Sequence, residues 1–193
     1  MLKVSTGDLV TFGNSNCLWQ FIHLIDIDTK MFEFKILDSQ FVNDIVALTK
    51  RVFDSHVGPQ YSQGGVEEFY KYITPESFKD RLNNDHILIG CIDENKLIAI
   101  LEIRKNDHIS LFFVDNNYQE RGVGREIFNY YLNFLKETNV KVEELSVNSS
   151  PNSVLFYEKL GFKKLGLEKE KNGIKYNLMR YTLQTEPTLT SSS

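Results

Sequence analysis

Three strand-like runs follow one another in the middle of the chain, over residues 86–93, 96–104 and 108–115. The links between them, Glu94-Asn95 and Lys105-Asn106-Asp107, are only two and three residues long. A parallel connection needs a crossover of about a dozen residues or more, so links of this length force antiparallel hairpins. The chain is therefore predicted to fold around an antiparallel meander, and the other elements have to pack against that sheet.

Helical patterns precede the meander. Apolar residues recur at helical spacing over 41–53, after a short alternating strand over 32–36. Two shorter amphipathic helices are predicted over 66–72 and 75–82, with the glycines of 58–65 in a loop before them. The predicted capping residues are Asp38 or Ser39 for the first helix, and Thr74, followed by Pro75, for the third.

After the meander, helices and strands alternate. The predicted order is a helix over 122–136, a strand over 142–147, a helix over 153–160 that Gly161 ends, and a last hairpin of 162–167 and 174–183 around Asn172-Gly173. A meander followed by alternating helices and strands indicates an α+β fold, with a mixed, mostly antiparallel sheet flanked by helices.

One domain accounts for this succession. A chain of 193 residues is long enough for one real core and too short for two comfortable ones. The patterned part covers residues 31–184. Residues 1–30 form an N-terminal extension whose pattern does not decide between strand and helix, and the polar residues 185–193 are expected to form a flexible tail.

Charge and cysteine content argue against several kinds of partner. The net charge is −4, and Lys and Arg are spread along the chain, which argues against a nucleic-acid partner. Cys17 and Cys91 fit neither a disulfide framework nor a metal-ligand spacing, so no metal is expected, and Cys91 is predicted to be a core residue. The apolar stretch 18–27 is too short and too polar to cross a membrane and lacks the features of a signal peptide. We therefore expect a cytoplasmic protein without a membrane partner; a homodimer stays open, because the stretch 18–27 can pack on a second subunit.

The strongest local motif links the end of the third strand-like run to the next helix. It is Gln-Glu-Arg-Gly-Val-Gly, residues 119–124, and its glycines Gly122 and Gly124 leave backbone N–H groups uncovered. The helix N-terminus adds a partial positive charge and Arg121 and Arg125 add two formal ones, so the loop suits a pyrophosphate. A tight strand-to-helix turn that needs glycine explains the two glycines equally well. A P-loop or a dinucleotide fold does not, because the required Gly-Lys-Ser/Thr end and third glycine are missing.

This motif resembles the Gln/Arg-x-x-Gly-x-Gly/Ala acetyl-CoA signature of the GNAT superfamily of N-acetyltransferases. A second stretch, residues 147–162, is similar to the second signature of that family and contains the characteristic Tyr-Glu-Lys-Leu-Gly-Phe core at 157–162. Two signatures at the right separation, with the expected strands between them, are far more specific than either alone. The resemblance covers about residues 32–183.

The resemblance implies an acetyl-CoA-dependent N-acetyltransferase, in which a primary amine of an unidentified acceptor attacks the thioester directly. The cofactor's pantetheine arm would pair with the backbone at the end of the third strand-like run, and the acetyl group would lie where the strand from Val142 splays away. The implied cofactor-binding residues are Phe112, Phe113, Val114, Gln119, Glu120, Arg121, Gly122, Val123, Gly124, Arg125, Asn148 and Asn152.

Two catalytic roles follow from the resemblance. Tyr157 would act as general acid for the leaving thiolate, since a phenol with a pKa of about 10 is protonated at neutral pH; a packed core aromatic is the other interpretation of this residue. His108 stands where some family members carry a glutamate base, and histidine can accept a proton near neutral pH. Glu102 is a second candidate for the base, and a surface histidine is the other interpretation of His108. His56 and His86 show no partner pattern.

The acceptor side and the function class stay open on the sequence alone. Five aromatic residues lie where the family places its acceptor-binding helices, and they either line a pocket or fill the core: Phe53, Tyr61, Phe69, Tyr70 and Tyr72. A non-catalytic acyl-CoA-binding or sensing domain can share the fold, because a fold does not fix a function. A nucleotide-binding module that uses the Gly122–Gly124 loop is a third reading, although its usual Lys and Asp partners are missing. The intact Tyr157 and Asn148 favour the enzyme.

Overall fold

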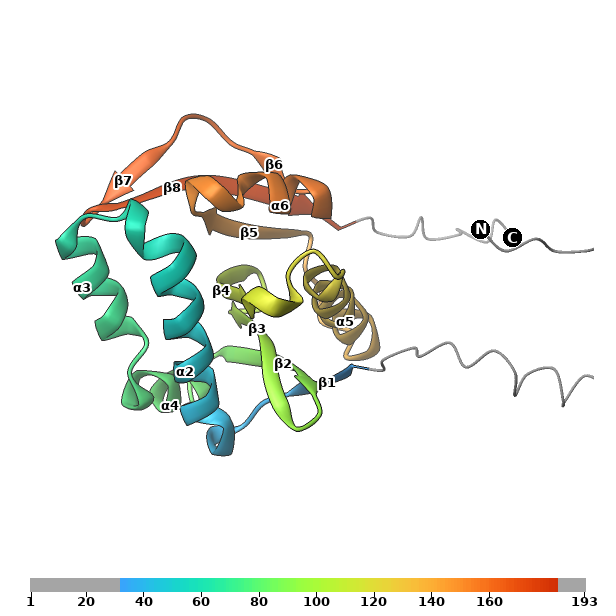
Figure 1. The fold of residues 1–193 in the computed structure, drawn as a ribbon. Helices are drawn as coiled ribbons and strands as arrows, with labels where there is room; N and C mark the ends of the chain where they lie inside the picture. The colour runs from blue at the N-terminus through green and yellow to red at the C-terminus, as the bar shows by residue number, and fades with distance from the viewer. Residues whose placement is uncertain (1–31, 184–193) are drawn as a thin grey trace, which may run out of the picture. The chain divides into compact units, whose positions relative to one another are not determined.

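The computed structural model describes residues 32–183, so the predictions for residues 1–30, which include Cys17, and for 185–193 lie outside the described part. Within it, a sheet of eight strands carries helices on both faces (Figure 1), which confirms the predicted α+β class. The strands are β1 (Glu33–Ile36), β2 (His86–Asp93), β3 (Lys96–Arg104), β4 (His108–Val114), β5 (Glu144–Ser149), β6 (Lys163–Lys164), β7 (Lys169–Lys171) and β8 (Ile174–Thr182). The helices are α2 (Val42–Val52), α3 (Gln63–Tyr72), α4 (Pro75–Leu82), α5 (Val123–Glu137) and α6 (Val154–Leu160). Shorter helical turns are η1 (Ser39–Phe41), η2 (Phe53–Val57), η3 (Gly58–Gln60), η4 (Asn116–Tyr118) and η5 (Pro151–Ser153).

The strand order is β1-β2-β3-β4-β5-β8-β6, and β7 pairs with β8 away from this path. Strands β1 to β4 are antiparallel neighbours, which confirms the predicted hairpins. Strand β5 then lies parallel to β4, and β8 runs antiparallel to β5. The sheet therefore consists of a four-stranded half, β1 to β4, and a second half around β8, and the two halves are joined by the parallel pairing of β4 with β5.

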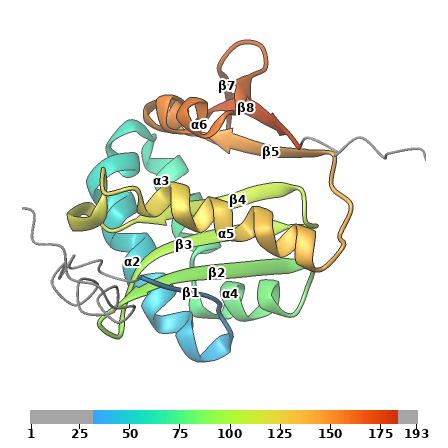
Figure 2. The ribbon, with the colours of Figure 1, turned by 90° about the vertical axis from the view of Figure 1, so that its right-hand side faces the viewer.

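Each face of the sheet buries its own core. Helices α5 and α6 cover one face, where Ile127 and Phe162 are buried, and α2 and α4 cover the other, where Ile45 and Phe78 are buried. From Ala99 to Leu101 the side chains of β3 alternate between the two cores, since a strand places successive residues on opposite faces. Figure 2 shows α5 in front of β2 to β4, with α4 behind them. Cys91 is fully buried, as predicted.

Capping side chains start two of the helical segments on the α2–α4 side. The Thr74 hydroxyl accepts from the Ser77 amide at 3.1 Å and caps α4, as predicted. The Asp38 carboxylate accepts from the Gln40 amide at 2.8 Å and caps the turn η1, whereas α2 itself follows Phe41 without a side-chain cap. Gly161 ends α6 in the left-handed region, at φ 102°. These local signals fix the element boundaries before any tertiary contact is considered.

Three element boundaries differ from the prediction. Helix α3 begins at Gln63, so Gly64 and Gly65 lie in its first turn and not in a loop; the Ser62 hydroxyl caps it by accepting from the Gly65 amide at 3.1 Å. A Cβ on Gly65 would lie 2.6 Å from the Gly173 carbonyl oxygen, so a glycine is required where α3 meets the β7–β8 turn. The strand predicted over 162–167 is reduced to β6, and the hairpin with β8 is formed by β7, which lies beyond the predicted range. Strand β5 begins at Glu144, two residues later than predicted.

The helix lengths and the placement of acidic, histidine and cysteine side chains bear on membrane spans and metal sites. Over residues 32–183, every helix is too short or too polar to cross a bilayer. The same residues hold no group of three acidic, histidine or cysteine side chains arranged for a metal ion.

Candidate active site

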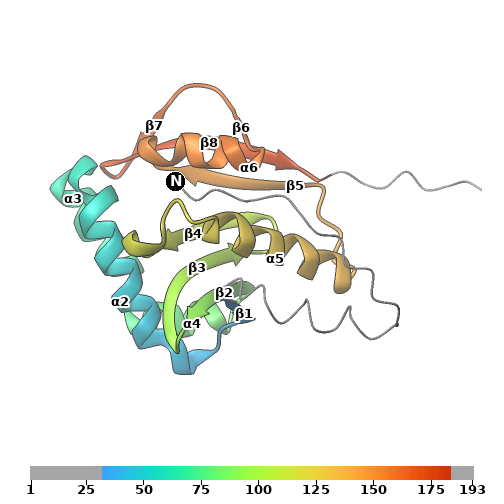
Figure 3. The same ribbon diagram turned by 45° about the vertical axis from the view of Figure 1, so that its right-hand side comes forward.

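The two halves of the sheet separate next to β4. Within the described residues, two pairs join β4 to β5, His108 with Ser146 and Ile109 with Val147. Beyond them β4 continues to Val114 along β3 alone, while β5 follows β8. The edge of β4 that faces β5 therefore carries backbone N–H and C=O groups that no neighbouring strand pairs. Figure 3 shows β5 diverging from β4, as the splay predicted by the family resemblance requires.

A β-bulge lies on β4 where this gap opens. Glu102 pairs with Leu111 and Ile103 with Ile109, so Ser110 is the extra residue on the β4 side. A bulge turns backbone groups away from the regular ladder and is common beside active sites. It supplies a geometry in which a backbone N–H can point into the gap, as an oxyanion site needs.

The predicted pyrophosphate loop lies at the far end of β4. Gly122 has φ 85°, a left-handed conformation that favours glycine, and α5 begins immediately after it. The Gly122 carbonyl accepts from the amides of Arg125 and Glu126 at 2.9 and 3.1 Å. The amides that precede them in the first turn have no partner inside the helix, and they combine with the helix dipole at this point. A helix start of this kind can hold an anion, and the binding of a pyrophosphate here stays a prediction.

The two glycines of the motif have different structural reasons. A Cβ on Gly122 would meet only the Glu126 carboxylate, at 3.8 Å, so the surroundings of Gly122 are open. A Cβ on Gly124 would lie 2.8 Å from the ring of Phe156, and Gly124 itself is buried. Gly124 therefore has a packing reason that the sequence did not reveal, because it makes room for α6 against α5; the expectation that both glycines uncover the backbone for a ligand stays a prediction.

Tyr157 is buried on α6, with a side chain that is 6% exposed. Its ring packs edge-on against Phe162, at 5.3 Å between centroids, and against Phe112 of β4, at 6.2 Å. Burial raises the pKa of the Tyr157 hydroxyl well above its usual value, so the phenol keeps its proton at neutral pH. Tyr157 is thus a core aromatic that lies against the strand bordering the gap, and its role as general acid stays a prediction.

His108 lies at the closed end of the gap. Its Nδ1 is 2.9 Å from the Ser146 hydroxyl, and that hydroxyl in turn donates to the Asp107 carbonyl at 3.3 Å. A hydroxyl that donates to Asp107 accepts from His108, so Nδ1 carries the imidazole proton and Nε2 is left with a lone pair. Burial, followed by the charge of Arg104, lowers the pKa of His108. The residue is therefore neutral at pH 7 and has a nitrogen able to take a proton.

Glu102, the second candidate for the base, is fully buried and already paired. Its carboxylate accepts from the Arg81 Nε at 2.6 Å and lies 2.9 Å from the Nδ1 of His86. Arg81 also donates to the Tyr72 carbonyl at 2.7 Å and stacks on the Tyr72 ring. This cluster fastens α4 and the end of α3 to the sheet, which is a structural role and gives His86 the partner that the sequence pattern did not reveal.

The other predicted cofactor residues lie around the gap at varied exposure. Those with exposed side chains are Gln119, Glu120, Arg121, Arg125, Asn148 and Asn152. The Gln119 side chain is engaged, because its Nε2 donates to the Val114 carbonyl at 3.1 Å. Phe112 and Phe113 point to opposite faces, since Phe112 packs on Tyr157 and Phe113 on Phe69. What these positions offer a ligand is thus mainly backbone and exposed polar groups.

The aromatic residues of the α2–α3 layer form a stack. Phe53 is fully buried and lies 3.7 Å, centroid to centroid, from Phe69, with Tyr61 and Tyr70 edge-on at 5.7 and 5.9 Å. Phe69 in turn contacts Phe113 of β4. Phe53 and Phe69 therefore fill the core, which is one of the two roles expected for these aromatics, while Tyr61 and Tyr70 lie at the rim of the stack.

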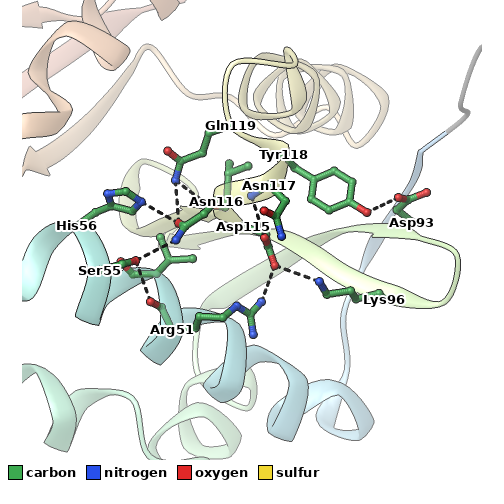
Figure 4. Close-up of polar contacts among 12 residues, drawn as sticks. Arg51, Ser55, His56, Asp93, Lys96, Asp115, Asn116, Asn117, Tyr118 and Gln119 are labelled. Carbon is green, nitrogen blue, oxygen red and sulfur yellow. Dashed lines mark hydrogen bonds and ion pairs between the residues drawn. The ribbon is translucent and has the colours of Figure 1, made fainter.

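Sequence reasoning missed Asp115, which follows β4 directly. Its carboxylate is 3% exposed and meets the Arg51 guanidinium at 2.7 Å, the Lys96 ammonium at 3.3 Å and the Asn117 amide at 3.1 Å (Figure 4). Burial alone would raise the pKa of this carboxyl, but the Asn117 hydrogen bond and the two cations outweigh burial and lower it. Nothing local in the sequence pairs Arg51 with Asp115, because they are 64 residues apart.

Comparison with known proteins agrees with this geometry. A model of the acetyltransferase (GNAT) domain matches residues 57–183, and the chain belongs to this GNAT acetyltransferase family. A search of curated proteins found no match.

Solved structures of the family share the fold. A GCN5-related N-acetyltransferase from Rhodopseudomonas palustris is 17% identical, with a TM-score of 0.67 over 78% of this chain and 95% of that one. The PaiA N-acetyltransferase from Thermoplasma acidophilum, solved in complex with coenzyme A, is 15% identical, with a TM-score of 0.65 over 79% and 99%. An N-acetyltransferase from Staphylococcus aureus Mu50 is 27% identical, with a TM-score of 0.57 over 79% and 97%.

Proposed function

We propose that this protein transfers the acetyl group of acetyl-CoA to a primary amine by direct attack of the amine on the thioester. The observation that carries the proposal is the gap between β4 and β5, which has an unpaired strand edge on one side, while β4 leads at its open end to the N-terminus of α5. The family membership and the coenzyme A complex of the Thermoplasma structure support the choice of cofactor.

The cofactor would lie along β4. Its pyrophosphate would accept hydrogen bonds from the first-turn amides of α5 around Gly122, with Arg121 and Arg125 close by in the sequence to neutralise its charge. Its pantetheine amides would pair with the backbone edge around Phe112, as an added strand does, and the Val114 carbonyl would join this pairing once the Gln119 Nε2 that now donates to it is displaced. The thioester would then lie at the bulge of Ser110, beside the aromatic cluster of Tyr157.

Proton transfer would be divided between two side chains. The amine loses a proton on attack, and the unprotonated Nε2 of His108 would receive it directly or through water. The thioester oxygen becomes an oxyanion, held by backbone N–H groups at the bulge. When the tetrahedral intermediate collapses, the C–S bond breaks, and the Tyr157 hydroxyl would donate a proton or a hydrogen bond to the CoA thiolate.

The test uses the purified full-length chain. Calorimetry with acetyl-CoA measures binding, and detection of free CoA thiol measures turnover over a panel of amines that includes polyamines, amino acids, aminoglycosides and peptide amines. We expect binding of acetyl-CoA and release of CoA with at least one amine. Binding of ATP in preference to CoA would contradict the proposal, and binding of acetyl-CoA without transfer to any amine would indicate a sensing domain.

A further inference from the structure

Asp115 lies at the centre of a polar network that joins the α2 side of the fold to the loop between β4 and α5 (Figure 4). Three parts of the chain converge on its carboxylate: Arg51 from the last turn of α2, Lys96 from the start of β3, and the Asn117 amide from η4. The Asp115 carboxylate is almost fully buried, whereas the Arg51 and Lys96 side chains are about half exposed, so water and salt are excluded only from the carboxylate end of these contacts. Asp115 therefore fixes the point at which the loop leaves the sheet.

Beside it, the side-chain amides of the loop have only one consistent orientation. The Gln119 Nε2 must be a donor, since the Val114 carbonyl at 3.1 Å can only accept. The same nitrogen lies 3.4 Å from the Asn116 Oδ1, which accepts from it. The His56 Nε2, at 2.8 Å from that Oδ1, therefore carries a proton and donates to it.

The network closes on α2. The Asn116 Nδ2 donates to the Ser55 hydroxyl at 3.2 Å, and that hydroxyl donates to the Arg51 carbonyl at 3.0 Å. Ser55 and His56 belong to η2, a π-helical turn that widens the end of α2. Such turns occur often at functional sites, because they redirect side chains that a regular helix would place elsewhere. Here the widened turn directs two side chains at the loop.

We propose that Asp115 and Arg51 are positioning residues for the cofactor, which hold the loop so that the first-turn amides of α5 are in place before the pyrophosphate arrives. The inference rests on the proposed function. If the loop is already ordered in the free protein, binding of CoA does not cost the entropy of ordering it. The affinity for CoA then depends on contacts that hold the loop, even though these contacts do not touch CoA. Binding strength is expected to change when these contacts are removed, while the chemistry at the thioester is not.

The variants are Arg51→Ala, Asp115→Asn and the double substitution. Asn at 115 keeps an oxygen for the Asn117 amide and removes only the charge. We expect each single substitution to weaken binding of CoA by about tenfold, because both remove the ion pair between Arg51 and Asp115; Asp115→Asn also removes the pair with Lys96. The double substitution should therefore weaken binding about as much as Asp115→Asn alone. Arg51→Lys restores the charge and is expected to recover most of the affinity. In turnover, KM for acetyl-CoA rises while kcat stays within about twofold.

A matched control is Lys35→Ala. Lys35 is 38% exposed, against 47% for Arg51, and pairs with Glu33 at 3.2 Å on β1, the edge strand farthest from the gap on the β4 side. Its loss is expected to leave CoA affinity unchanged. Thermal unfolding of every variant separates the two kinds of effect, since a purely structural role lowers Tm and leaves the Kd for CoA as in the parent.

Calorimetry with CoA on the full-length chain decides the matter. Parent-like Kd values in both single variants, with the parent binding CoA, would overturn the inference and leave the proposed function standing. Losses that add in the double variant would also overturn it, because Arg51 would then contact the cofactor directly. If the parent binds no CoA, the proposed function fails, and this inference fails with it. Arg51 is half exposed, so Arg51→Ala keeps the test open even if Asp115→Asn does not fold.

Discussion

At the scale of single residues, Tyr157 combines a packing role with a proposed chemical one, and the two are separable. Its ring is held by Phe112 and Phe162, and its hydroxyl is the only part that the proposed chemistry uses. Burial keeps that hydroxyl protonated, as an acid requires. In the proposed mechanism the ring would place the hydroxyl, and the hydroxyl would perform the proton transfer.

Tyr157→Phe tests this division. The substitution keeps the packing, so the unfolding temperature and the Kd for acetyl-CoA should change little. The leaving thiolate would lose its proton donor, and general acid catalysis of this type contributes about 10²–10⁴ in rate. We expect the loss in kcat with KM for acetyl-CoA nearly constant. Full activity in a well-folded Phe variant, measured with a confirmed amine, would show that Tyr157 is a core aromatic only.

His108 makes a pH-dependent prediction. Burial lowers the pKa of His108 from the usual 6.5, so the imidazole is unprotonated at neutral pH and can accept a proton. It loses this ability only when the pH falls below its lowered pKa. The acid limb of the kcat profile should therefore have its midpoint below pH 6.5.

His108→Gln removes the titrating group and keeps a donor for Ser146. It should lower kcat by about 10²–10⁴ and abolish the acid limb, if His108 is the base. A Gln variant that keeps both the rate and the limb of the parent would assign the base elsewhere, to ordered water or to the acceptor itself.

At the scale of elements, Gly122 and Gly124 belong to one sequence motif at the start of α5, but they have different structural reasons. Gly122→Val adds a branched side chain at a left-handed position and covers the first-turn amides, so the affinity for CoA should fall about a hundredfold or more. Gly124→Val instead drives a side chain into Phe156, and its main expected effect is a loss of about 1–3 kcal/mol or more in the free energy of unfolding. Calorimetry with CoA and thermal unfolding on both variants distinguish them; parent-like CoA binding by Gly122→Val would remove the loop from the cofactor site.

Elements whose signals are local could be predicted from the sequence. Caps such as Thr74, the short links of the meander and the Asn172-Gly173 turn act within a few residues, and the structure places all of them as expected. The start of α3 was predicted too late, because glycines usually break a helix and the reason for Gly65 lies on β7–β8, far along the chain.

The candidate site was predictable only where a motif carries it. The positions of the Gly122 loop and of Tyr157 follow from signatures in the sequence. The pairs Arg51–Asp115 and His56–Asn116 span 64 and 60 residues and leave no periodic trace, and the pairing of Glu102 with Arg81 is equally invisible in the sequence. Long-range polar contacts are the part of a site that a single sequence hides.

At the scale of the whole molecule, residues 32–183 contain both cores, every strand of the described sheet and all residues of the proposed site. The family match, residues 57–183, lies inside this range. A protein that lacks residues 1–30 should therefore unfold cooperatively and bind CoA with the affinity of the full chain. Thermal unfolding and calorimetry on the truncated and full-length proteins check this. Loss of cooperative unfolding on truncation would show that the apolar stretch 18–27 completes the core, whereas a change from dimer to monomer with CoA binding intact would place that stretch in a subunit interface.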